Sequence, residues 1–132
     1  MVKLENILAI DIGSKRIGLA IANTVAKLPV PLEVIANDRL VFQTIKDIIS
    51  KYNVKQVVVG LPRNMSGEET RQSQFSREFA AKLEKVLGLK VKFADESLST
   101  KRAQTLPSRQ GKSNHLDSMA ACFILEEYLE QK

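Results

Sequence analysis

Short apolar runs, rich in β-branched residues or alternating with polar ones, predict five strands. They cover residues 7–10, 16–22, 30–35, 54–60 and 89–94. The short connection at residues 13–15 favours an antiparallel hairpin between the first two strands. Pro31 lacks an N–H group and favours a sheet edge for the third. Val57, Val58 and Val59 make the fourth strand apolar on both faces, which is typical of the middle of a covered parallel sheet.

Apolar residues then recur at three- and four-residue spacing in three segments, which predicts three helices that each bury one face. The first helix is expected to begin near Asn37 or Asp38, either of which is a suitable N-cap, and Gly88 is placed to end the second. The third is expected over residues 116–129. The stripes are Leu40, Val41, Ile45, Ile48, Ile49 and Tyr52; Phe75, Phe79, Leu83 and Val86; and Leu116, Ala120, Phe123, Ile124 and Tyr128.

The resulting element order is β-β-β-α-β-α-β-α. Strands that alternate with helices imply parallel neighbours joined by right-handed crossovers, and the leading hairpin adds antiparallel pairing. The sequence therefore predicts an α/β fold with a mixed five-stranded sheet and helices on its faces, an order found in ribonuclease H-like domains. With no break in composition and a length of 132 residues, one domain over 1–132 is expected.

Composition excludes several classes of protein. Apolar residues make up 44% of the chain and charged residues 27%, as in ordinary globular domains, which excludes a disordered tail and a fibre. The single cysteine, Cys122, excludes an intramolecular disulfide, lies in an apolar stretch and is expected to be buried. No apolar run is long enough to cross a membrane, so we expect a cytoplasmic protein without a membrane partner. The net charge of +5 favours an anionic partner.

Four acidic residues occur where the predicted strands and the last helix meet one edge of the sheet. Asp11 ends the first strand, Asp95 and Glu96 end the fifth, and Asp117 begins the last helix. Ligands of open α/β sheets gather at the carboxyl ends of the strands, and clustered carboxylates favour a hard divalent cation. We therefore predict a Mg²⁺ or Mn²⁺ site that cleaves phosphodiester bonds. Asp95 and Glu96 face opposite ways in an extended strand, so only one should reach the metal directly.

Each acid also has a structural interpretation. Asp11 precedes Gly13 and suits a turn, Asp117 suits the positive end of a helix dipole, and Asp95 and Glu96 suit a solvated strand end. The group of acids at neighbouring ends, more than any one of them, favours the metal site.

Basic and polar residues border the same edge in the predicted fold and are candidates for binding nucleic acid. Phosphate contacts would supply affinity while carboxylates hold metal. The alternative is a scatter of solubilising charges. His115, close before Asp117, is either a residue of the helix cap or an outer-shell group near the metal. The candidates for binding nucleic acid are Lys15, Arg16, Arg63, Asn64, Arg71, Lys101, Arg102, Arg109 and Lys112.

Four blocks of sequence together resemble the YqgF/RuvX family of ribonuclease H-like proteins, which includes pre-16S rRNA nucleases and Holliday junction resolvase-like proteins. The blocks are IDIGSKRIGLA at 10–20, VVGLPRNMSG at 58–67, DESLST at 95–100 and DSMAA at 117–121. They follow the family's order over nearly the whole chain. Ser97 replaces the usual Arg of the third block, and Ser66 replaces the usual Asp of the second.

The resemblance implies a metal-dependent nuclease of structured nucleic acid that matures the 5′ end of 16S rRNA. By position, Asp11, Glu96 and Asp117 would be the metal-binding acids, with Asp95 as a further candidate. A first alternative is a resolvase of four-way DNA junctions, whose paired cuts favour a homodimer over a monomer. A second alternative is a nucleotide-binding module, since Asp11 and Gly13 also resemble the hairpin of actin-like and sugar-kinase-like ATPases. A third is a non-catalytic nucleic-acid-binding factor.

Overall fold

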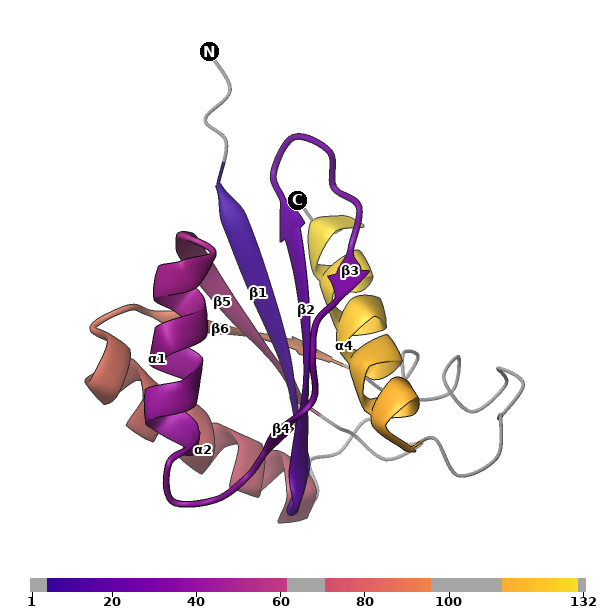
Figure 1. Cartoon of the computed structure of the whole chain (residues 1–132). Coiled ribbons are helices and arrows are strands. Elements are labelled where there is room, and N and C mark those ends of the chain that lie inside the picture. The colour runs from indigo at the N-terminus through magenta and orange to yellow at the C-terminus, as the bar shows by residue number, and fades with distance from the viewer. Residues whose placement is uncertain (1–4, 62–70, 96–112, 131–132) are drawn as a thin grey trace.

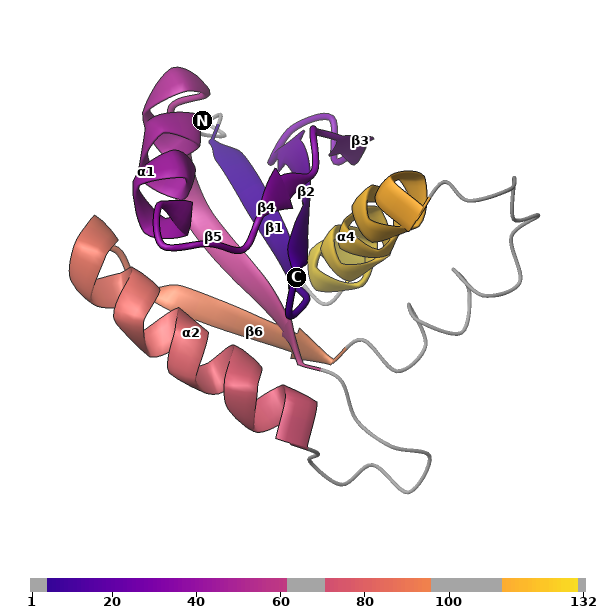
Figure 2. The ribbon, with the colours of Figure 1, turned by 60° about the horizontal axis from the view of Figure 1, so that its bottom comes forward.

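The computed structural model describes residues 5–61, 71–95 and 113–130, which form a mixed sheet with helices on both faces (Figure 1). The helix α4 covers one face, and α1 and α2 cover the other (Figures 1 and 2). The chain order is β1 (Asn6–Ile12), β2 (Arg16–Asn23), β3 (Val30–Pro31), β4 (Ile35–Ala36), α1 (Val41–Lys51), β5 (Val54–Leu61), α2 (Arg71–Leu87), β6 (Val91–Asp95) and α4 (Ser113–Glu130).

The sheet combines an antiparallel hairpin with parallel strands, as the sequence predicts. Its order is β3-β2-β1-β5-β6, with β1 antiparallel to β2 and parallel to β5, and β5 parallel to β6. The strand expected over 30–35 is divided into β3 and β4, which both pair with β2. Among the described residues the sheet therefore has six strands and not five. Pro31 has no N–H group for the ladder, and Leu32 makes one more bond, to the Leu19 carbonyl at 2.8 Å, before the chain leaves β2.

Alternate residues of the same strands build two separate apolar cores. In β1, Leu8, Ile10 and Ile12 face α1 and α2, whereas Ile7 and Ala9 face α4. The α1/α2 core consists mainly of large aliphatic side chains. The α4 core is rich in small ones: Ala9, Ala20, Ala22, Ala94, Ala121 and Cys122.

The apolar stripe predicted for α2 is wrong at both of its ends. Phe75 and Val86 are 38% and 43% exposed, and the helix instead buries Ser73, Ser76 and Ala80 along with Phe79 and Leu83. Small side chains let the backbone of α2 lie close to β5, so the helix is rotated away from the stripe that residue size predicted.

The ends of the helices follow local hydrogen bonding. The Asp38 carboxylate accepts a bond from the Leu40 N–H at 3.0 Å, and the Asp38 carbonyl accepts one from the Val41 N–H at 3.1 Å, which together close the start of α1. Gly88, with φ of +69°, follows the end of α2 as predicted. The last helix begins at Ser113, earlier than the predicted Leu116.

Candidate active site

Asp11 lies near the carboxyl end of β1, on the face of the sheet that α4 covers. Ile10 and Ile12 belong to the α1/α2 core and Ala9 to the α4 core, so the two-residue period of the strand assigns Asp11 to the α4 face. It is half-buried, unlike the fully buried Ile10 beside it. A polar side chain therefore interrupts an otherwise apolar strand where that strand meets the edge of the sheet.

The strands on either side of Asp11 present very small residues to the same face. Gly18 of β2 is directly opposite Asp11 in the ladder. On the other side, Gly60 follows Val59, the partner of Ile10, and Gly60 pairs in turn with Ala94 of β6. Glycine and alanine leave room beside the carboxylate for a ligand to approach the backbone closely.

A tight turn follows Asp11 and fixes its position. The Gly13 N–H donates to the Arg16 carbonyl at 3.0 Å, and Ile12 pairs with Ile17 across the hairpin. A Cβ atom at Gly13 would lie 2.6 Å from the Arg16 carbonyl oxygen, a separation that backbone atoms do not tolerate. Glycine is thus required two residues after Asp11 by the approach of the opposing strand.

Two side chains bind the carbonyl groups that come directly after Asp11. The Gln72 amide at the start of α2 donates to the Ile12 carbonyl at 2.9 Å, and the Asn37 amide donates to the Gly13 carbonyl at 2.8 Å. The Asn37 N–H also donates to the Lys15 carbonyl at 2.9 Å. Sequence analysis offered Asn37 only as a helix cap and did not single out Gln72, because a single amide side chain at the end of a helix carries no motif.

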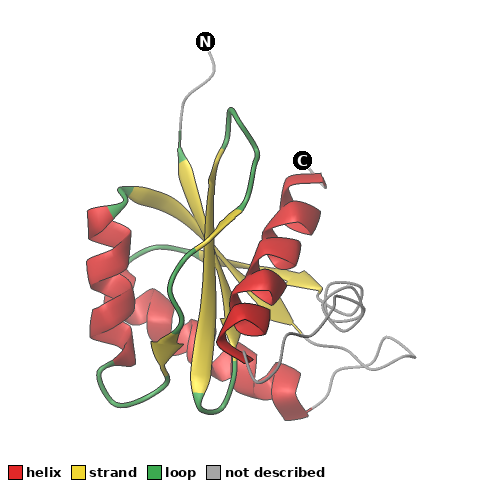
Figure 3. Ribbon diagram, turned by 45° about the vertical axis from the view of Figure 1, so that its right-hand side comes forward, coloured by secondary structure: helices red, strands yellow, loops and turns green. Residues whose placement is uncertain are grey.

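The strand ends and the start of α4 lie at the same edge of the sheet (Figures 1 and 3). Asp95 is the last residue of β6 and pairs with Leu61, the last residue of the parallel strand β5. Asp117 and His115 lie within α4. Since α4 begins at Ser113, its first turn contains no acidic residue, which weakens the interpretation of Asp117 as a charge that favours the helix dipole.

The structure describes only some of the predicted site residues. Lys15 and Arg16, at the turn after Asp11, and Arg71, at the start of α2, are exposed near the same edge. Within the described ranges, no group of three or more His, Cys, Asp or Glu side chains is arranged to hold a metal ion. Outside them lie Arg63, Asn64, Glu96, Lys101, Arg102, Arg109 and Lys112.

Cys122 is buried in the α4 core, as predicted. Burial raises the pKa of its thiol from 9.0 to about 11, and the nearby Glu126 carboxylate adds to the effect. The nucleophilic thiolate is therefore scarce at neutral pH, and Cys122 serves as a small apolar side chain. None of the helices in the described part of the chain is long and apolar enough to cross a membrane.

Comparison with known proteins decides the family. The family model described as "RuvX: Holliday junction resolvase" matches residues 5–131. The chain belongs to the RuvX family. Among the curated relatives of this RuvX protein is a "putative pre-16S rRNA nuclease" of Sulfurihydrogenibium sp. (strain YO3AOP1), 36% identical, with 97% of this chain and 92% of the relative covered. A protein of the same name from Rickettsia africae (strain ESF-5) is 37% identical, with 94% and 85% covered.

The relationship confirms the resemblance drawn from the four sequence blocks and confirms the predicted class of enzyme, a nuclease that hydrolyses phosphodiester bonds.

Solved structures confirm the predicted ribonuclease H-like fold. Thermus thermophilus RuvC, in complex with a Holliday junction substrate, superposes with a TM-score of 0.57 at 12% identity and covers 96% of this chain and 94% of its own. Fowlpox virus resolvase, in complex with Holliday junction DNA, gives a TM-score of 0.56 at 16% identity and covers 96% and 97%. At these identities the likeness concerns the fold alone.

Proposed function

We propose that the chain is a metal-dependent nuclease of precursor 16S rRNA whose reaction centre is built on Asp11. The position of Asp11 carries the proposal: a half-buried carboxylate at the carboxyl end of a parallel strand, flanked by glycine and alanine and followed by a turn that two amide side chains hold. A carboxylate in this position suits a hard cation, which in turn could hold a phosphate group of the substrate.

The residues available at this edge suit a Mg²⁺ or Mn²⁺ ion. All the candidate donors are carboxylates, the small neighbours of Asp11 leave room for a ligand, and Gly13 keeps the turn beside it tight. Asp11, Glu96 and Asp117 would hold the metal. When bound, such an ion supplies an activated water and stabilises the charge of the leaving oxygen.

Alternation along β6 favours Glu96 over Asp95 as the second metal-binding acid. Val91 belongs to the α1/α2 core and Ala94 to the α4 core. If the two-residue period of an extended strand continued past Ala94, position 96 and not position 95 would share the face of Asp11. Glu96 lies outside the described residues, so its role rests on this period and on the family resemblance.

The position of Asp117 along α4 agrees with a role for it as the third acid. Position 117 precedes the fully buried Ala121 by about one helical turn, and Ala121 packs against the sheet on the same face as Asp11. His115 comes two residues earlier and is a candidate for an outer-shell group.

Some residues of this chain would position the Asp11 carboxylate, and others would bind the phosphate groups of the substrate. Asn37 and Gln72 hold the backbone after Asp11, so the carboxylate need not reorganise when substrate binds. Lys15, Arg16 and Arg71 border the edge with positive charge and suit contacts with phosphate groups. We extend this binding role to Arg63, Asn64, Lys101, Arg102, Arg109 and Lys112.

The choice of substrate rests on the relatives. Those at 36–37% identity over most of their length are named for pre-16S rRNA, and we infer that this chain also processes the 5′ end of that precursor. A free, buried thiol suits a reducing compartment, and we accordingly propose a cytoplasmic enzyme.

The test is cleavage of an RNA that carries a 5′ precursor extension, with Mg²⁺ or Mn²⁺ and with the metal chelated. We expect Asp11→Asn to lose at least about 100-fold in rate, since even outer-shell partners of metal sites commonly contribute 10–100-fold. Lys92→Gln, an exposed substitution on β6, is the control and should cleave normally. Cleavage by Asp11→Asn at the wild-type rate would refute the proposed centre.

A second candidate is cleavage of four-way DNA junctions, which the description of the matching family favours. A resolvase makes two symmetric cuts and is expected to be a homodimer, whereas processing of one RNA end needs only a monomer. The same assay with a four-way junction in place of the RNA, combined with sedimentation, separates the two. Faster junction cleavage by a stable dimer would assign the chain to recombination.

A further inference from the structure

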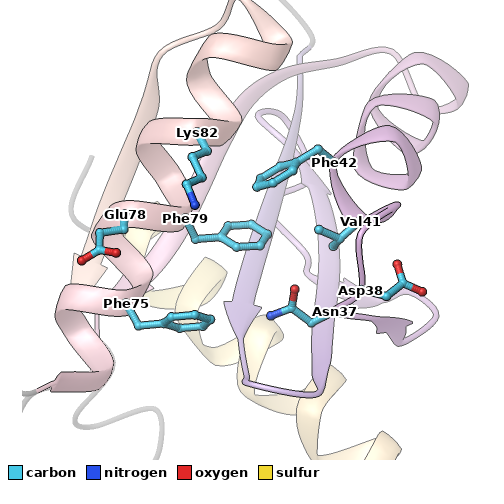
Figure 4. Close-up of a pocket in the computed structure, with 8 residues that line it drawn as sticks. All are labelled: Asn37, Asp38, Val41, Phe42, Phe75, Glu78, Phe79 and Lys82. Carbon is cyan, nitrogen blue, oxygen red and sulfur yellow. The ribbon is translucent and has the colours of Figure 1, made fainter.

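An aromatic pocket lies between α1 and α2, on the face of the sheet opposite Asp11 (Figure 4). Its volume is about 190 Å³, which is enough for one planar ring system. Phe42 and Phe79 form its inner wall, with ring centroids 4.9 Å apart, and Phe75 stands at its edge with 38% of its surface exposed. Val41, Asn37, Asp38, Glu78 and Lys82 complete the lining.

The polar side chains at the pocket suit a ligand that both donates and accepts hydrogen bonds. The oxygen of Asn37 and the ammonium group of Lys82 point into the space between the helices, whereas the carboxylates of Asp38 and Glu78 point away from it (Figure 4). Asp38 is engaged with the Leu40 N–H at the start of α1. A hydrogen-bond acceptor and a donor suit the edge of a nucleobase, and the aromatic rings beside them suit its face.

The pocket adjoins the candidate active site through Asn37. Its side-chain nitrogen donates to the Gly13 carbonyl and its N–H to the Lys15 carbonyl, so one residue contacts the turn after Asp11 and also lines the pocket. Gln72, one turn before Phe75 on α2, bonds the Ile12 carbonyl. A strand of nucleic acid whose phosphate backbone lies at Asp11 would pass the exposed Lys15 on its way around the edge of the sheet to Phe75.

The net charge of this face favours a polyanion over a basic or neutral partner. Residues 38–51 and α2 together carry seven Lys and Arg against four Asp and Glu. The cationic residues are Arg39, Lys46, Lys51, Arg71, Arg77, Lys82 and Lys85.

We propose that the pocket between α1 and α2 receives one unstacked base of the single-stranded part of the nucleic-acid substrate, with Phe75 as the stacking residue. This inference rests on the proposed function, because it assumes that the strand lies at Asp11. It makes Phe75 a residue of substrate binding that acts on a nucleotide near the cleaved bond and not on the bond itself. Sequence analysis placed Phe75 in the buried stripe of the second helix and did not name it as a binding residue.

Binding is measured with an RNA hairpin that carries a 5′ single-stranded extension, in the Asp11→Asn background so that the RNA stays intact. Stacking of one base on an aromatic residue contributes about 1–3 kcal/mol, so Phe75→Ala should raise Kd roughly 5- to 150-fold. Phe75→Tyr should bind like the parent protein. Val86→Ala removes an exposed apolar side chain from the same side of α2, three turns away, and should leave Kd unchanged.

A set of RNAs with one abasic nucleotide at each position of the extension shows whether a base is involved. At one position the abasic RNA should bind weakly to the parent protein, and Phe75→Ala should cause no further loss with it. A 2-aminopurine at that position should change its fluorescence on binding to the parent protein and not to Phe75→Ala. An equal loss with intact and abasic RNAs, or an unchanged Kd, would overturn the proposal.

Two outcomes would assign the pocket to another occupant. If wild-type protein forms a dimer that Phe75→Ala dissociates while RNA affinity stays the same, a second copy of the chain fills the pocket. If the oligomeric state and the RNA affinity are both unchanged and Phe75→Ala instead loses affinity for an apolar or basic peptide, the pocket binds a protein. Thermal unfolding of each variant checks the fold, and failure of the proposed function appears separately, as cleavage that survives Asp11→Asn.

Discussion

The two faces of the sheet are built from alternate residues of the same strands, and they differ in kind. The α1/α2 face buries large branched side chains such as Ile10, Leu19 and Val57, whereas the α4 face buries alanine and carries Asp11 among glycines. Large side chains contribute most of the transfer free energy of a core, and small ones allow close approach. The large packing residues of the sheet and the candidate reaction centre are thus concentrated on opposite faces of one layer of backbone, and the predictions below test that separation.

Ile10→Ala should have the largest effect on stability. Ile10 is fully buried in the α1/α2 core, and truncation of such a side chain leaves a cavity and costs about 2–5 kcal/mol. Asp11→Asn, at the next position but on the other face, should leave the free energy of unfolding nearly unchanged while it abolishes cleavage. Urea denaturation of both variants measures the contrast. Comparable destabilisation by the two changes would contradict the separation of roles.

Ala20→Leu probes the α4 face with the opposite change. Ala20 is fully buried and pairs with Ala9, so three added carbon atoms must displace α4 or the strand, at about 1–3 kcal/mol. Leu19→Met, next to it on the α1/α2 face, keeps the volume and should cost less than about 1.5 kcal/mol. Thermal unfolding is the measurement. If Ala20→Leu were as stable as wild type, close packing of α4 would not be a requirement.

The sequence predicted the fold well where residue type and period agree. The hairpin, the central strand with Val57, Val58 and Val59, and the helix ended by Gly88 are all confirmed. The prediction failed for α2, because period and size favoured Phe75 and Val86 while the helix packs through Ser73, Ser76 and Ala80. Close contact between a helix and a strand rewards small side chains, which hydrophobicity alone does not detect.

The candidate site was predictable in position and not in its supports. Strand ends located Asp11 and Asp95 because carboxyl ends of parallel strands share an edge. Asn37 and Gln72 were out of reach, since each bonds a carbonyl far away in sequence and any polar residue is plausible at such a position. The aromatic pocket was missed because the apolar period of α2 assigned Phe75 to the buried face of the helix.

The loss of stability at high pH should report on the burial of Cys122 in the α4 core. Because burial raises the pKa of the folded thiol from 9.0 to about 11, the unfolded chain releases this proton first as the pH rises. The contribution of Cys122 to stability is therefore complete below pH 9 and lost between pH 9 and about 11. Urea midpoints across this range should fall less steeply for Cys122→Ala. At neutral pH, the Cys122 thiol should also react slowly with a thiol reagent. Rapid reaction would contradict a closed α4 core.

Two serines of α2 give the smallest effects, of opposite sign. Both are buried against the sheet, but among the described residues the Ser76 hydroxyl has no hydrogen-bond partner, whereas Ser73 takes part in a polar contact. Removal of an unpaired buried hydroxyl relieves its desolvation cost, and alanine is the better helix former, so Ser76→Ala should stabilise by up to about 1 kcal/mol. Ser73→Ala should destabilise by about 0.5–1.5 kcal/mol because it removes a contact. Denaturation of the pair decides whether small side chains on α2 serve only close packing: a loss of stability in Ser76→Ala would show that its hydroxyl is bonded in solution.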